Sequence, residues 1–270
     1  MKPDIQRNVA LWRRMSAALS GGLERDDVMR QKVFGLLVLA VVAAGCSSTK
    51  DPASLAQNDP YEPTNRAITG FNSTVDNAVA KPVAKFYNHA LPQSARTGVH
   101  NFLTNLGKPV VFGNDVLQGE VTRAGQTVAR FTVNTTLGVG GLVDVASMIG
   151  IPEHDEDFGQ TLGVYGVGEG PYLVIPFMGP NPPRDLAGSV VDIFMDPTTY
   201  ITFHGSDTWY AVRAGVSVLD LRARNIDTLE QIERTSIDVY ATTRSLYRQY
   251  RNSEIRNGRP DTSDGDTPDF

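Results

Sequence analysis

The densest group of chemically active side chains in the sequence is Glu153-His154-Asp155-Glu156-Asp157. Alternating carboxylates can bind Ca²⁺, and a histidine beside aspartates can contribute to a zinc site. The segment lacks the glycine and glutamate spacing of an EF-hand loop, and no second histidine is near. We therefore interpret it as helix-terminus capping and a solvated charge run, with a periplasmic hydrolase site as the rival reading.

Other catalytic and cofactor signatures are missing from the sequence. It contains no G-x-S-x-G elbow, no H-E-x-x-H motif and no phosphate-binding loop. Gly166, Gly168 and Gly170 are followed at once by proline, where a dinucleotide fingerprint would open a helix. His89, His100 and His204 are isolated along the chain and are treated as structural. We expect no catalytic residue, no metal, no cofactor and no enzymatic activity.

Cys46 is the only cysteine, which excludes an intramolecular disulfide and a cysteine-rich zinc site. A short basic stretch and 13 uncharged, mostly apolar residues precede it, a run too short for a transmembrane helix. The ending Ala43-Ala44-Gly45-Cys46 resembles the bacterial lipobox. We predict a lipoprotein signal peptide over 29–45 and lipidation of Cys46, against the alternative of a buried structural cysteine.

The residues on either side of this signal add two expectations. Glu24, Asp26 and Asp27 do not suit a basic leader, so residues 1–28 are interpreted as an extension or a mis-assigned start, with translation beginning at Met29. Ser47 stands where an aspartate would resemble an inner-membrane retention signal, which favours sorting to the outer membrane.

Composition divides the rest of the chain. Residues 46–60 are polar and predict a flexible tether, and residues 251–270 predict a disordered acidic tail. Residues 61–250 are expected to fold as one domain. The formal net charge of -5 argues against a nucleic-acid partner.

Helical periodicity dominates the expected domain. Two long helices carry one apolar stripe each, through Val121, Ala124, Val128, Phe131 and Thr135 and through Trp209, Val212, Val216, Leu219, Ala223 and Ile226. Shorter helices are predicted at 94–106, 109–117, 141–149 and 183–195. One hairpin is expected between 161–165 and 172–176, so the fold class is mainly α. The stripes could face lipid or an ordinary core, which periodicity alone does not distinguish.

Several ordered blocks carry a family resemblance. They are DPYEPTNRAITGFN (59–72), KPVAKFY (81–87), NFLTNLGKPV (101–110), NDVLQG (114–119), ARFTVNTTLGVGGLVDVAS (129–147) and HDEDFGQTLGVYGVGEGPYLVIPFMGP (154–180). Together they resemble the MlaA family of lipoproteins, also called VacJ. Beyond Asp192 we find little sequence similarity to the family, so the resemblance assigns no role to the carboxy-terminal helices.

The resemblance implies a fold and a function. It implies a compact helical ring in the inner leaflet of the outer membrane, anchored on the periplasmic face, with an amphipathic central channel. It implies removal of mislocalised phospholipids from the outer leaflet and their transfer to a periplasmic phospholipid carrier protein, which maintains lipid asymmetry. Trimeric porins are the implied partners, and no nucleotide or metal is required.

Two alternatives stay open beside this function. A lipoprotein tether or assembly factor would hold partners together without transport, and a hydrolase would use residues 153–157. If the chain transports phospholipids, we predict that Gly166, Gly168 and Gly170 form a mobile gating turn on the lipid path, because glycine gives the backbone unusual freedom. The rival interpretation is a tight hairpin whose φ > 0 positions simply require glycine.

Overall fold

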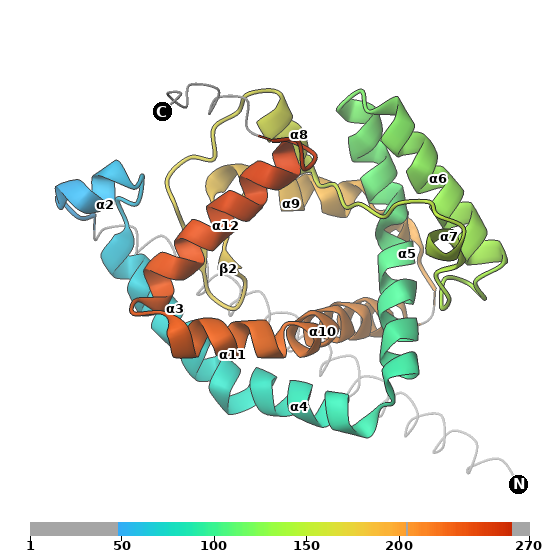
Figure 1. The fold of residues 1–270 in the computed structure, drawn as a ribbon, viewed down its shortest axis with the longest axis horizontal. Coiled ribbons are helices and arrows are strands. Elements are labelled where there is room, and N and C mark those ends of the chain that lie inside the picture. Colours follow the sequence, from blue (N-terminus) through green and yellow to red (C-terminus); the bar gives the residue numbers. More distant parts are fainter. Residues whose placement is uncertain (1–47, 204, 261–270) are drawn as a thin grey trace, which may run out of the picture. The chain divides into compact units, whose positions relative to one another are not determined.

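A computed structural model of the chain describes residues 48–203 and 205–260 (Figure 1). Residues 49–260 belong to a single compact unit. Cys46, the signal peptide at 29–45, the extension at 1–28 and His204 lie outside the described residues, as do 261–270 of the expected tail. The expectations for these positions therefore stay predictions.

The described chain is built from helices and one small pair of strands. Their bounds are α2 (Pro52–Ala56), α3 (Glu62–Val75), the π-helix η1 (Asp76–Ala80), α4 (Lys81–Ala90), α5 (Gln93–Leu117), α6 (Val121–Thr136), α7 (Val145–Met148), α8 (Phe158–Val164), β1 (Val174–Ile175), β2 (Gly179–Pro180), α9 (Pro183–Met195), the 3₁₀-helix η2 (Pro197–Tyr200), α10 (Ser206–Arg224), α11 (Ile226–Thr235) and α12 (Val239–Ile255).

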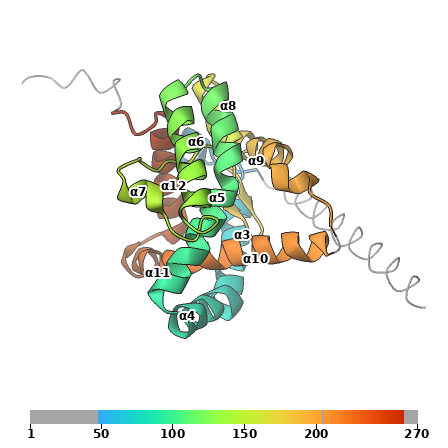
Figure 2. The same ribbon diagram turned by 90° about the vertical axis from the view of Figure 1, so that its right-hand side faces the viewer.

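Within residues 49–260 the helices follow one another around a ring (Figure 1). One continuous stretch of α3, η1 and α4 forms one side, and α5 turns away from it with α6 packed along its length. Helices α8 and α9 pack together opposite α4, and α12 runs from the α3 side of the ring to α8. Helix α10 contacts both α4 and α5. Turning the molecule by 90° shows α5 and α6 side by side (Figure 2). The prediction of a mainly α, ring-like domain is confirmed.

The position of the hairpin is a correction. Val174 pairs with Pro180 and Ile175 with Gly179, so β1 is joined to the segment after it rather than to 161–165. Residues 161–164 belong to α8, which the Asp157 side chain caps by accepting a hydrogen bond from the Gln160 backbone N–H. A cap at that position starts a helix, which is why the predicted first strand is wrong.

Helix boundaries also differ from the sequence expectation in three places. The candidate at 141–149 is shortened to α7, Val145–Met148. The candidates 94–106 and 109–117 form the single helix α5, which tolerates Pro109 in its interior. Conversely, the long stripe from 209 to 226 is interrupted at Asn225, where α10 ends and α11 begins. The predicted helices at 121–135 and 183–195 are confirmed as α6 and α9.

The predicted tether is wrong for residues 51–60. Asp51 caps α2, and Asp59 is fully buried. The Asp59 carboxylate accepts hydrogen bonds from Asn65, from Arg244 at 2.5 Å and from the Tyr240 hydroxyl. Polar composition misleads here because the polar side chains are partners of buried groups rather than of water. For the same reason the expected tail is wrong at 251–255, which continue α12.

Helix α6 shows which way the apolar stripes face. Its Val121 is 80% exposed and Val128 is 46% exposed, whereas Thr127, Arg130 and Asn134 on the opposite side are buried. The helix thus reverses the arrangement of a water-soluble core helix, whose apolar stripe is the buried one. None of the described helices combines the length and apolar content needed to span a membrane.

Candidate functional site

A cavity of about 490 Å³ lies between α5, α6, α12 and the segment that precedes α8. It falls within the size range of small-molecule sites, but polar groups dominate its walls. The lining residues are His100, Thr104, Arg123, Glu153, His154, Asp155, Tyr250, Glu254, Asn257 and Gly258. Segments far apart in the sequence therefore meet at one polar site.

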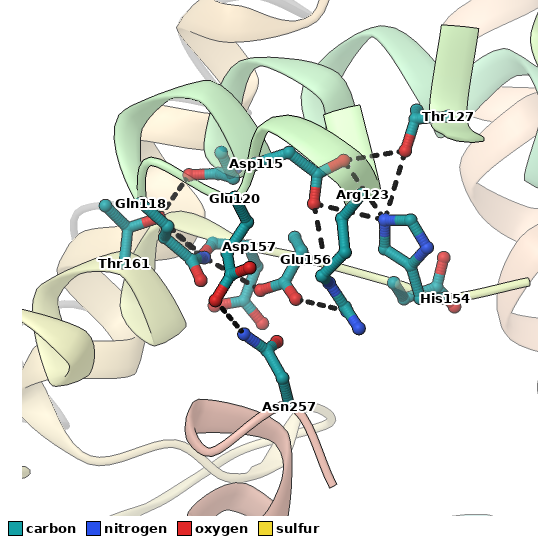
Figure 3. Close-up of polar contacts among 12 residues, drawn as sticks. Asp115, Gln118, Glu120, Arg123, Thr127, His154, Glu156, Asp157, Thr161 and Asn257 are labelled. Atoms are coloured by element: carbon teal, nitrogen blue, oxygen red, sulfur yellow. Dashed lines mark hydrogen bonds and ion pairs between the residues drawn. The ribbon is translucent and has the colours of Figure 1, made fainter. Parts of the chain in front are cut away.

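His154 is held rigidly on the wall of this cavity (Figure 3). Its Nε2 lies 3.1 and 3.0 Å from the two carboxylate oxygens of Asp115 and 3.1 Å from the Thr127 hydroxyl. Thr127 also donates a hydrogen bond of 2.6 Å to Asp115, which is completely buried. This network positions the imidazole and joins α5, α6 and the segment before α8.

Arg123 and Glu156 form a second polar contact beside it. Arg123 Nη2 lies 2.5 Å from Glu156 Oε1, and Gln118 donates to the other oxygen at 2.8 Å (Figure 3). Burial raises the pKa of Glu156, although the hydrogen bond from Gln118 and the charge of Arg123 oppose it. The carboxylate is thereby committed to protein partners.

Lys108 ties α5 to the acidic segment. The Lys108 side chain is only 4% exposed, and its Nζ donates to the His154 backbone carbonyl at 2.8 Å and to Asp155 at 3.2 Å. Glu153 lies 3.4 Å from the same Nζ and 3.5 Å from Arg130. One buried ammonium therefore serves two carboxylates that reach the cavity.

The acidic segment is only in part what the sequence predicts. Asp157 caps α8, as expected of a helix terminus, and Asp155 is exposed. The solvated interpretation is wrong for Glu156, which is buried, and for His154, whose side chain is only 9% exposed through its contacts with α5 and α6. In the described ranges, no group of three or more histidine, cysteine, aspartate or glutamate side chains could hold a metal ion.

Arg251 fastens α12 to the far side of the site. It contacts Asp157 at 2.6 Å and Asp185 at 2.9 Å. Burial alone would raise the pKa of Asp157, but hydrogen bonding to Arg251 and its charge outweigh it, so this pKa is lowered. The pKa of Asp185 is lowered in the same way, by Arg184, Arg251 and the Tyr247 hydroxyl. These contacts fix α12 against α8 and α9.

The three glycines of the predicted turn lie outside the cavity wall. Gly166 and Gly170 have positive φ, whereas Gly168 does not, and a Cβ at Gly166 or Gly168 would meet no atom within 4 Å. The following residues are anchored, since Arg248 pairs with Glu169 and Asn58 donates to the Gly170 carbonyl. The backbone at two of the three positions thus requires glycine, as the tight-turn interpretation states.

Several lining residues escaped the sequence analysis. Arg123 belongs to α6, and Tyr250, Glu254 and Asn257 come from the end of α12 and the residues after it. His100, treated as isolated, reaches the cavity and lies 2.8 Å from Asp220 of α10. No local motif marks these residues, because only the ring closure brings them together.

Comparison with known proteins gives consistent matches. The sequence profile of the family described as MlaA lipoprotein matches residues 57–254. The intermembrane phospholipid transport system lipoprotein MlaA of Haemophilus influenzae is 34% identical over 242 residues, which cover 88% of this chain and 95% of that protein. The protein of the same name from Escherichia coli is 34% identical over 234 residues, 85% of this chain and 90% of that one.

A solved structure is also similar. It comes from work on the structural basis for maintenance of bacterial outer membrane lipid asymmetry. It superimposes with a TM-score of 0.65 at 35% sequence identity, over 73% of this chain and 98% of the other.

Proposed function

This chain belongs to the MlaA lipoprotein family, and on that premise we propose that it is an outer-membrane lipoprotein that keeps the lipid composition of the two leaflets different. It removes mislocalised phospholipids from the outer leaflet and passes them through an amphipathic channel towards a periplasmic carrier protein. Cys46 is the proposed lipidated residue that anchors it on the periplasmic face.

The observation that carries the proposal is the reversed amphipathicity of the ring. Large apolar side chains are exposed on α4, α5, α6 and α9, including Phe86, Val116, Val121 and Phe194. Buried positions are instead occupied by charged and polar groups such as Arg130 and Asp115. Exposing so much apolar surface to water is unfavourable, whereas lipid tails would cover it. A surface of this kind suits a protein embedded in one leaflet.

The polar interior supplies the other half of the mechanism. A phospholipid headgroup faces a steep barrier in hydrocarbon, because burying a charged or zwitterionic group there is costly. Hydrogen-bonding walls such as those of the cavity between α5, α6 and α12 lower that barrier without bond chemistry. The apolar tails can remain against apolar surface while the headgroup follows the polar path.

Partners follow from the same proposal. A trimeric porin is the proposed neighbour in the membrane, and a periplasmic phospholipid carrier protein is the proposed acceptor. The name of the relatives, a lipoprotein of an intermembrane phospholipid transport system, supports a role in a multi-protein pathway.

The direct test is the amount of surface-exposed phospholipid in cells. Cells that lack this protein should expose more phospholipid in the outer leaflet, and the wild-type gene should restore the low level. Phe194→Asp should fail to restore it, because it places a charge on the apolar exterior. Gln249→Asp adds the same charge at an exposed polar position of α12 and should restore it.

Other outcomes would support the alternatives. If deletion leaves surface phospholipid unchanged but lowers the amount of an associated complex, the protein is a tether. If a His154→Asn variant that folds normally loses function and added chelator abolishes purified activity, the hydrolase interpretation gains support. Cys46→Ala should accumulate as uncleaved precursor, and mass spectrometry should find a triacylated amino terminus at Cys46 in the wild type.

We also propose that Gly166, Gly168 and Gly170 form a turn that controls access to the lipid path. Gly168 is the informative position, because its φ is not positive and a side chain there meets no atom. Gly168→Val should restrict the backbone and abolish lipid movement while thermal stability and porin binding persist. If the variant transports normally, or only unfolds, the turn has no gating role.

A further inference from the structure

We propose that the cavity between α5, α6 and α12 selects phospholipid headgroups that carry both a phosphate and a primary ammonium, as phosphatidylethanolamine does, over purely anionic headgroups. This inference rests on the proposed transport function and specifies the substrate class of the same site. It follows from the charge balance of the wall and from the groups there that lack protein partners.

The wall carries more negative than positive charge. Glu153, Asp155 and Glu254 line the cavity, whereas Arg123 is its one lining residue with a permanent positive charge. The buried Lys108 ammonium behind the wall is shared between Glu153 and Asp155, and Arg123 already contacts Glu156, so the negative charge of Glu254 is left without a paired cation. An anionic headgroup would therefore meet repulsion that an ammonium-bearing headgroup would not.

Glu254 is the carboxylate that most needs a cation. It is half-buried, and among the described residues its carboxylate makes no salt bridge or hydrogen bond. Burial raises the pKa of Glu254, and the negative charge of Asp155 raises it further. A ligand ammonium placed beside Glu254 would relieve both effects, because an opposite charge favours the ionised form.

Two further wall residues hold unused hydrogen-bonding atoms. Arg123 Nε is a buried donor without a hydrogen-bond partner, and Asn257 Oδ1 is a buried acceptor without one. Leaving such atoms unpaired is unfavourable. Both atoms are covered by protein, and Arg123 Nε also lies 3.8 Å from an Asp115 oxygen. Rotation of these two side chains into the cavity would therefore let a phosphate oxygen accept from Arg123 and an ammonium donate to Asn257. The Arg123 guanidinium would thus contact the phosphate of the headgroup, and the acidic side chains would contact its ammonium.

The same walls do not suit a bare metal ion. In residues 48–203 and 205–260 no three potential ligands converge, and Thr104 and Tyr250 contribute hydroxyl groups instead. An organic cation that hydrogen-bonds through several N–H groups fits such a dispersed set better than an ion that requires a compact oxygen shell.

The test is binding of short-chain lipids to the purified full-length protein in detergent. Dihexanoyl phosphatidylethanolamine should bind about tenfold more tightly than dihexanoyl phosphatidylglycerol in calorimetric titrations, a difference of about 1.4 kcal/mol. Glu254→Gln should weaken ethanolamine-lipid binding about five- to tenfold and leave glycerol-lipid binding equal or stronger. Asp155→Asn should act in the same direction with a smaller effect, since Asp155 is more exposed.

Glu233→Gln is the matched control. It makes the same substitution on α11, where Glu233 pairs with Lys81 away from the cavity, so the ratio of the two affinities should not change. Thermal unfolding of each variant excludes a folding defect. Equal binding of the two lipids by the wild type would overturn the selectivity, as would Ca²⁺ that competes with the lipid through Glu254. Low surface phospholipid in cells that produce the wild-type protein would show that transport itself stands even if the selectivity fails.

Discussion

Two regions of the molecule solve the problem of burial in opposite ways. Where α5, α6 and α8 meet, the interior is polar and the exposed side of the helices is apolar. Where β1, α3 and α12 meet, Tyr172, Val174 and Tyr240 form a buried apolar cluster with Ile68 and Tyr247 packed against it. The first arrangement gains little from the hydrophobic effect in water, and the second gains as an ordinary soluble core does.

The two regions therefore have different roles in the ring. The aromatic cluster closes the ring and suits an aqueous surrounding. The polar interior instead depends on complete hydrogen bonding, because each unpaired polar atom in it is costly. Substitutions on the buried polar face of a helix in this region should therefore cost much more stability than substitutions on its exposed apolar face.

The largest expected effect is at Arg130. It donates two hydrogen bonds of 2.9 Å to Asp144 and one of 2.5 Å to the Ile151 carbonyl, and it is almost completely buried. Arg130→Ala leaves the carboxylate and the carbonyl without these donors and should lower the free energy of unfolding by about 3–5 kcal/mol. Denaturant unfolding in detergent measures it, and a loss under 1 kcal/mol would contradict the polar-core description.

The second largest effect is expected at low pH, which should lower the stability of the polar region. Burial would raise the pKa of Asp144, but hydrogen bonds from Ser147, Asn134 and Arg130 outweigh it and lower the pKa from 3.8 to about 2. A lowered pKa stabilises the folded state above the unfolded value, so this stability is lost as the pH falls from about 4 towards 2. The loss is at most about 2 kcal/mol, because water screens the contacts of the partly exposed Asp144 carboxylate.

The aromatic cluster should respond to base instead. Burial raises the pKa of Tyr172 and of Tyr240, and the negative charge of Asp59 raises both further. Their stability is present below the ordinary tyrosine value and is lost as the pH rises past it. Circular dichroism at both pH extremes, combined with tyrosinate absorbance, separates the two regions. Because the chain has nine tyrosines, Tyr172→Phe and Tyr240→Phe identify the two signals. Each variant should remove tyrosinate absorbance that develops above the ordinary midpoint, and loss of absorbance at the ordinary midpoint would contradict this assignment.

Tyr240→Phe should have a smaller effect. It keeps the ring in the cluster but removes the hydroxyl that donates to buried Asp59, which retains Asn65 and Arg244 as partners. We expect a loss of about 1–2 kcal/mol in the free energy of unfolding. Tyr250→Phe, on the exposed side of the same helix, serves as the control and should change stability little.

The smallest effect is expected at Val128. It lies one position after buried Thr127 on α6 and is nearly half exposed. Val128→Ala in detergent should change the free energy of unfolding by less than about 0.5 kcal/mol, because neither the valine nor the alanine that replaces it is enclosed by protein. A cost above that of Arg130→Ala would reverse the assignment of inner and outer faces.

The sequence periodicity predicts the helices, but it does not predict whether their apolar sides face the interior or the exterior. The stripe on α6 has the correct period, yet a periodic pattern does not say which solvent covers the apolar side. The partners of the buried polar groups are also distant: Asn114 donates to Asp192, and His100 lies beside Asp220. A single sequence does not encode such pairs locally, so the polar core and the cavity became visible only with the fold.

Local composition misled at both ends of the domain. Residues 51–60 and 251–255 contain few apolar side chains, which is typical of linkers. Here Asp59 and Arg251 are buried because each meets opposite charges from a remote helix. The residues that complete the cavity, Glu254 and Asn257, lay in the segment assigned to the tail for the same reason.

The closure of the ring at Asp59 has a consequence for the order of folding. The partners Tyr240 and Arg244 follow Asp59 by 181 and 185 residues, close to the full length of the described unit. Contacts of such long sequence separation form late, because the entropy of a large loop must be lost before they contribute. A chain that emerges from a translocation pore amino terminus first would therefore hold its apolar helices in an open arc until α12 arrives. The carboxylate of Asp59 should therefore stay accessible to water until that last helix docks.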